Sequence, residues 1–163
     1  MVLVRALLWI ALFLCTPTLL HSQYGWGSMR LYGSVRDYFS YKKLEGVIVT
    51  LEQEGEVLQS VATDKKGDYE LHLPYEGKLI LRFAKEGYLS KFATIDTRGV
   101  PPRENAPNMR VEITLFSPIP GRDASFLNQP FGRAKYDPAV EAIMWDSVYE
   151  EAIRSTRVEY LKK

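Results

Sequence analysis

The stretch Thr63-Asp64-Lys65-Lys66-Gly67-Asp68-Tyr69-Glu70-Leu71 decides the fold of this chain, because it reads as a tight turn followed at once by a β-strand. The Asp64 side chain can close an Asx-type turn, and Gly67 can adopt the positive φ that a chain reversal needs. Tyr69 and Leu71 alternate with polar residues, which is typical of a strand that buries one face. The stretch therefore predicts one strand of a half-buried sheet.

Other segments repeat this alternation or are rich in β-branched and aromatic residues. They are residues 31–36, 47–52, 57–62, 79–84, 89–96 and 109–115, which with 69–73 make seven predicted strands. Short strands separated by turn signals favour an antiparallel β-sandwich. Residues 97–108 contain three prolines and are predicted to be a loop. The fold class predicted from these patterns is all-β.

Two more corners accompany the first one. Residues 33–37 (GSVRD) precede 44–49 (LEGVIV), and residues 83–88 (FAKEGY) place Gly87 after another strand. In this order the motifs resemble the carboxypeptidase regulatory-like domain, a transthyretin-like Greek-key β-sandwich, over residues 29–117. The resemblance implies a binding or scaffolding module rather than an active site. The TRGVPP loop and the extended tail are also similar to small envelope proteins of Bacteroidota, which implies an accessory subunit in the periplasm or at the outer membrane.

The first 22 residues have the layout of a secretory signal peptide. One basic residue, Arg5, precedes an apolar run that is too short for a stable membrane anchor, and Ser22 is the expected cleavage point. Lipidation at Cys15 is an alternative. Residues 23–28 would form a connector. Removing the leader leaves equal numbers of basic and acidic residues and no cysteine, so we expect an exported, disulfide-free protein with no transmembrane helix and no affinity for nucleic acid.

The C-terminal part is predicted to be an extension with one helix. Residues 118–136 lack periodicity and read as an irregular linker, whereas residues 137–163 read as an amphipathic helix with Asp137 as N-cap and Pro138 at its first position. The helix would present large apolar side chains, namely Met144, Trp145, Tyr149 and Ile153. These residues either pack on the sandwich or bind a partner, and the sequence leaves both readings open.

A second candidate contact surface lies in the first loop. The aromatic residues Tyr38, Phe39 and Tyr41 stand among basic neighbours, and aromatic rings on loops can stack on sugars or on a partner protein. They could equally cap the open end of the sandwich. This surface makes a carbohydrate- or peptidoglycan-binding module the alternative function.

Catalytic chemistry has no visible basis in the sequence. His72 is the only histidine after the leader and is expected on the outward face of its strand, without the companions that catalysis or metal binding needs. Turn chemistry accounts for Asp64 and Asp68 without calcium. We therefore expect no catalytic residue, no metal and no cofactor. The predicted function is that of a non-enzymatic scaffold or accessory subunit that docks to an envelope transport, secretion or assembly complex.

Overall fold

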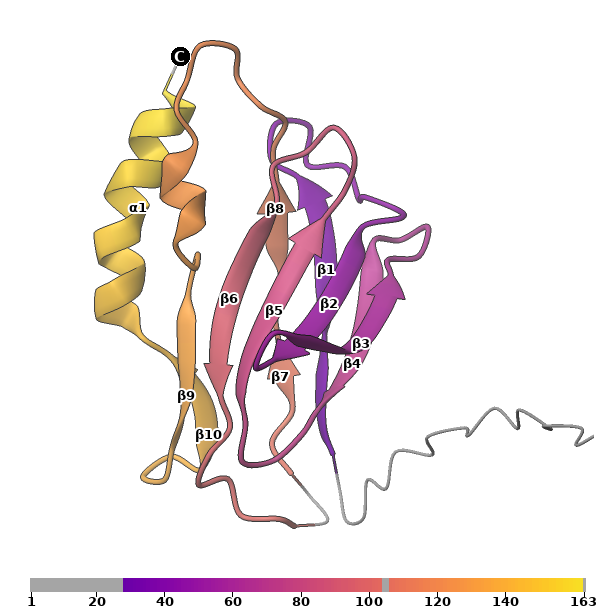
Figure 1. Ribbon diagram of the computed structural model, residues 1–163, viewed down its shortest axis with the longest axis vertical. Helices are drawn as coiled ribbons and strands as arrows, with labels where there is room; N and C mark the ends of the chain where they lie inside the picture. Colours follow the sequence, from indigo (N-terminus) through magenta and orange to yellow (C-terminus); the bar gives the residue numbers. More distant parts are fainter. Residues whose placement is uncertain (1–27, 104–105, 163) are drawn as a thin grey trace, which may run out of the picture.

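The computed structural model describes residues 28–103 and 106–162, and in it two β-sheets pack face to face as a β-sandwich (Figure 1). The predicted signal peptide, Cys15 and nearly all of the connector lie outside the described residues. The elements in chain order are β1 (Met29–Asp37), β2 (Ile48–Gln53), β3 (Glu56–Ala62), β4 (Asp68–Leu73), β5 (Lys78–Ala84), β6 (Lys91–Asp96), β7 (Met109–Arg110), β8 (Ile113–Leu115), the 3-10 helix η1 (Ser125–Asn128), β9 (Arg133–Asp137), β10 (Ala142–Trp145) and α1 (Ser147–Leu161).

The predicted β-sandwich is confirmed, but its sheets are mixed rather than purely antiparallel. In the smaller sheet β4 pairs antiparallel with β1, whereas β7 and β8 run parallel to β1. The larger sheet has the order β10-β9-β6-β5-β2-β3, in which β9 runs parallel to β6. Parallel pairing needs a long connection between the strands, and residues 38–108 provide it between β1 and β7, as residues 97–132 do between β6 and β9. The strand number therefore exceeds the predicted seven.

The alternation read from the sequence gives the correct inward faces. Tyr69, Leu71 and Leu73 of β4 are buried, and their polar neighbours along the strand are exposed. The same alternation buries Leu79, Leu81 and Phe83 of β5. The Tyr69 ring meets Phe83 edge to face at 5.4 Å, and its hydroxyl donates to the Val111 carbonyl at 2.9 Å, so the buried phenol is satisfied.

The turn before β4 is built by the two residues singled out from the sequence. Asp64 Oδ1 accepts hydrogen bonds from the backbone N–H of Lys66 at 2.8 Å and of Asp68 at 2.9 Å. Gly67 has φ +71°, a region that favours glycine. The Gly67 carbonyl then accepts from the Val35 N–H at 2.8 Å, so that the turn is tied to β1.

The C-terminal prediction is wrong in its secondary structure. Residues 118–136 are not wholly irregular, since they contain η1 and most of β9, and the helix begins at Ser147 rather than Pro138. Asp137 accepts from the Ala139 N–H at 2.9 Å in the turn of a β9–β10 hairpin, while Asp146 caps α1 by accepting from the Tyr149 N–H. An aspartate followed by proline can open a turn as well as a helix, and the turn prevails here because β9 pairs with β6.

The extension packs against the sandwich beside which it lies (Figure 1). Tyr160 of α1 is buried, with its ring 5.5 Å from Phe116 and 5.2 Å from Phe126 of η1. Its hydroxyl accepts from the Ile119 N–H at 3.1 Å. These contacts fix the position of the helix relative to the sheets. Within the described residues, α1 lacks the length and apolar character that crossing a bilayer requires.

Candidate functional site

Of the three aromatic residues in the first loop, Tyr38 packs against the sandwich, whereas Phe39 and Tyr41 are exposed. Tyr38 is half-buried and meets Phe116 edge to face at 6.1 Å, so its ring covers one end of the sandwich. Phe39 and Tyr41 are 52% and 66% exposed. Asp37 holds the loop, because its Oδ1 accepts from the Phe39 and Ser40 N–H groups. Partial burial opposes the ionised carboxylate, but these hydrogen bonds outweigh it and lower the pKa of Asp37.

The predicted contact residues of the tail mostly face their own chain. Trp145 lies in β10, where its ring packs 6.1 Å from Phe131. Tyr149 of α1 donates its hydroxyl to the Pro130 carbonyl at 2.6 Å. Ile153 lines a groove between α1 and the sandwich. Met144 is the exception, with 48% of its surface exposed.

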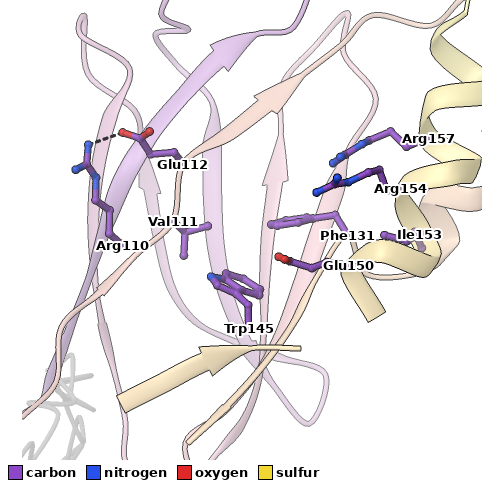
Figure 2. Close-up of a pocket in the computed structure, with 9 residues that line it drawn as sticks. All are labelled: Arg110, Val111, Glu112, Phe131, Trp145, Glu150, Ile153, Arg154 and Arg157. Carbon is purple, nitrogen blue, oxygen red and sulfur yellow. Dashed lines mark hydrogen bonds and ion pairs between the residues drawn. The ribbon is translucent and has the colours of Figure 1, made fainter. Parts of the chain in front are cut away.

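This groove runs between the segment that leads from β7 to β8 and helix α1 (Figure 2), and its volume is about 270 Å³. It is lined by Arg110, Val111, Glu112, Phe131, Trp145, Glu150, Ile153, Arg154 and Arg157. Figure 2 shows Arg154 and Arg157 reaching from the helix toward the gap, with Arg110 and Glu112 on the opposite wall. Arg110 Nη2 pairs with Glu112 Oε1 at 2.5 Å. Three arginines and two glutamates line the groove together with apolar side chains, so its lining has a small excess of positive charge.

A second cavity adjoins the groove and contains a buried lysine. Lys91 starts β6 on the inward face, and its Nζ donates to the Thr114 carbonyl of β8 at 2.6 Å. The ammonium also lies 4.2 Å from the centre of the Phe116 ring. Burial, reinforced by the charge of Arg157, lowers the pKa of Lys91 to about 7. Lys91 therefore bridges the two sheets at the edge that α1 covers.

Sequence reasoning missed Lys91 and the arginines of α1. Lys91 has the same parity as the buried Ala93 and Ile95, so the alternation along β6 could have placed its side chain inside. Arg154 and Arg157 had no such signal, because the groove joins segments that lie some forty residues apart.

The described residues do not assemble a cluster of metal-ligating side chains. In 28–103 and 106–162, no three His, Cys, Asp or Glu side chains come close enough to hold a metal ion. His72 is exposed on β4, as its alternation predicts. What the groove and cavity offer is hydrogen-bond donors and positive charge beside apolar surface, an arrangement suited to binding.

Comparisons with known proteins give likenesses of fold only. No protein-family model matches the chain, and no curated protein matches it. Among solved structures, the Bacillus anthracis TIE protein is 22% identical with a TM-score of 0.45, over 55% of this chain and 17% of that one. The 3-chlorocatechol 1,2-dioxygenase of Rhodococcus opacus is 17% identical with a TM-score of 0.42, over 60% of this chain and 62% of that one. The 5-hydroxyisourate hydrolase of Klebsiella pneumoniae is 16% identical with a TM-score of 0.43, over 56% of this chain and 92% of that one. The chain thus spans less than two thirds of the first two proteins, and none of these likenesses carries a functional assignment.

Proposed function

We propose that this protein is a non-enzymatic scaffold or accessory subunit, exported to the periplasm or the periphery of the outer membrane, that docks to an envelope protein complex. The turn motifs around Gly33, Gly67 and Gly87 support membership of the carboxypeptidase regulatory-like family, and the TRGVPP loop with the extended tail supports an origin in a Bacteroidota envelope. The proposed docking surface is the outer edge of the C-terminal extension rather than the inner face of α1.

One observation carries this proposal. β10 ends the larger sheet, and among the described residues no strand pairs with its outer edge. Apolar side chains accompany this edge: Met144 in β10, Val140 in the preceding turn and Val148 in the first turn of α1, the last being 80% exposed. A sheet edge with unpaired backbone groups is a template for another strand, and neighbouring apolar side chains add affinity. The occupant we propose is an extended segment of a partner protein.

The experiment is a pull-down from solubilised envelope with the tagged protein, followed by mass spectrometry. A variant with Met144→Glu and Val148→Glu should lose the partner, because each change places a charge on the docking edge without touching the core. Val57→Glu is the matched control, since Val57 is equally exposed on β3 at the opposite end of the same sheet. A partner that is retained by the double variant, or lost with the control, would refute docking at β10.

A second candidate function, carbohydrate or peptidoglycan binding, is favoured by the exposed rings of Phe39 and Tyr41. Tyr41 also lines the cavity that contains Lys91. Trp145, the single tryptophan of the described residues, lines the adjoining groove and reports on ligands there. Titration with oligosaccharides should change its fluorescence, and Tyr41→Ala should abolish the change. Unchanged fluorescence, with no heat of binding, would leave only the docking function.

A further inference from the structure

The cavity around Lys91 lies at the edge of the sandwich where β6 and β8 face helix α1, and its volume is about 330 Å³. It is lined by Ser34, Arg36, Tyr41, Lys91, Glu112, Ile113, Thr114, Phe131 and Arg157. These residues come from β1 and the loop after it, from the β7–β8 segment, from β6, from the segment before β9, and from α1. The cavity is therefore a product of the whole fold and not of one loop.

Lys91 is the most unusual residue of this cavity, because its side chain is only 4% exposed. A buried ammonium is costly unless it is paired, and buried lysines normally have a carboxylate nearby. Among the described residues Lys91 makes no ion pair, and its one polar contact is the Thr114 carbonyl. An ammonium has three N–H donors, so two of them remain for another acceptor.

The other cations of the cavity also lack carboxylate partners in the described part of the chain. Arg36 and Arg157 line the cavity, and neither pairs with a carboxylate of residues 28–103 or 106–162. Glu112 is the one acidic residue of the lining, and it already pairs with Arg110. Three cationic groups of the described residues thus line one cavity against a single carboxylate that is already paired, and the closeness of Arg157 disfavours the charge of Lys91 further.

A buried hydroxyl gives independent evidence. Ser34 is only 4% exposed, and its Oγ has no hydrogen-bond partner among the described residues. Buried polar groups in proteins are nearly always satisfied, so an orphaned hydroxyl that lines a cavity indicates a missing partner. The Ser34 hydroxyl can donate to an oxygen acceptor, as can the neighbouring ammonium and guanidinium groups.

We propose that this cavity is an oxyanion-binding site, in which Lys91, Arg157 and Ser34 donate hydrogen bonds to a carboxylate or a phosphate group. Arg36 adds charge from the strand β1, and Tyr41 borders the cavity on its loop side. Charge-assisted hydrogen bonds of this kind are the strong ones, and partial exclusion of water strengthens them. The site is separate from the docking edge at β10, so either proposal can fail while the other holds.

The test is isothermal titration of the purified protein with inorganic phosphate and, in a second arm, with succinate at pH 6.5. We expect saturable binding of at least one of these anions, and the preferred arm identifies the phosphate or the carboxylate source. Arg157→Gln should weaken binding by about tenfold, the usual loss when a charged hydrogen-bond partner is removed. Arg154→Gln is the matched control, because Arg154 lies about one turn earlier on α1 and does not line this cavity.

Two further variants separate binding from folding. Lys91→Met retains the length of the buried side chain and removes its charge, so the variant should melt no lower than the parent and yet fail to bind either anion. Ser34→Ala removes only the orphaned hydroxyl and should weaken binding without loss of stability. Absence of saturable binding for both anions would overturn the proposal. Equal weakening by Arg154→Gln and Arg157→Gln would also overturn it, because the attraction would then be diffuse rather than that of a built site.

Discussion

Substitution of Gly67 by alanine tests the close approach that ties the β4 turn to β1. A Cβ at this position would lie 2.6 Å from the Val35 carbonyl oxygen and 3.1 Å from the Leu44 N, both of them backbone atoms. The backbone cannot move away easily, because the Gly67 carbonyl accepts from the Val35 N–H and the Leu44 N–H donates to the Val35 carbonyl at 3.0 Å. The turn also requires the positive φ of Gly67.

Gly87 provides a matched control for the magnitude. Its φ is +79°, close to that of Gly67, but a Cβ there would meet nothing within 4 Å. Gly87→Ala should therefore cost only the left-handed conformation, about 1 kcal/mol. Gly67→Ala introduces the same backbone strain and in addition forces packed backbone atoms apart. Overpacking of this kind typically costs roughly 1–3 kcal/mol. We expect Gly67→Ala to lower the free energy of unfolding by about 2–4 kcal/mol.

The assay is equilibrium unfolding in urea followed by circular dichroism, with both variants measured beside the parent. Lys66→Ala serves as a second control, because the exposed Lys66 side chain makes no hydrogen bond in the structure, and it should be nearly silent. Equal destabilisation by Gly67→Ala and Gly87→Ala would refute the reasoning, since the contact of Gly67 with β1 would then contribute nothing.

Three other perturbations give further expected outcomes. Burial lowers the pKa of Lys91 to about 7, whereas the pKa of an unfolded lysine is about 10.4. Between these two values the unfolded state binds more protons than the native state, so the free energy of unfolding should rise from about pH 7 to about pH 10. Urea unfolding of Lys91→Met should lack this rise. Asp146→Ala should cost about 0.5–2 kcal/mol, because it removes the N-cap of α1, and an unchanged melting temperature would place the helix start elsewhere. Tyr160→Ala should cost about 3–5 kcal/mol through the lost contacts with aromatic rings, whereas Val158→Ala on the exposed side should be close to neutral in the same melts.

The sandwich could be predicted because its signals are local. In β4 a strict alternation of apolar and polar residues identifies both the strand and its buried face, and in β5 the apolar residues at every second position do the same. The turn residues Asp64 and Gly67 then fix where the chain reverses. The alternation of β6 also places Lys91 on the inward face. A charged residue at an inward position, however, usually indicates that the strand has ended, so the sequence alone did not identify Lys91 as buried.

The tail could not be predicted in the same way, because its decisive contacts are distant in sequence. Residues 142–145 form a short apolar segment that fits a strand or a helix, and length alone does not separate the two. The strand prevails because β9 has the edge of β6 to pair with, and β10 then pairs with β9. Likewise, residues of β1, β6, β8 and α1 come together to form the cavity around Lys91, and the sequence of any one segment does not predict this arrangement.

Because Met144 and Trp145 lie in β10, helix α1 has fewer apolar side chains to bury than the sequence predicts. A helix that began at Pro138 would carry apolar residues over more of its surface than one packed face can cover. The actual α1 has a single inward stripe, in which Tyr149, Ile153 and Tyr160 follow one another at intervals of about one or two turns. Segments beside the sandwich pack against this stripe through Tyr149 and Tyr160, whereas Val148 in the first turn of α1 stays exposed. The surface that the docking hypothesis then uses is the outer edge of β10, where Met144 lies exposed, and the hypothesis is tested there.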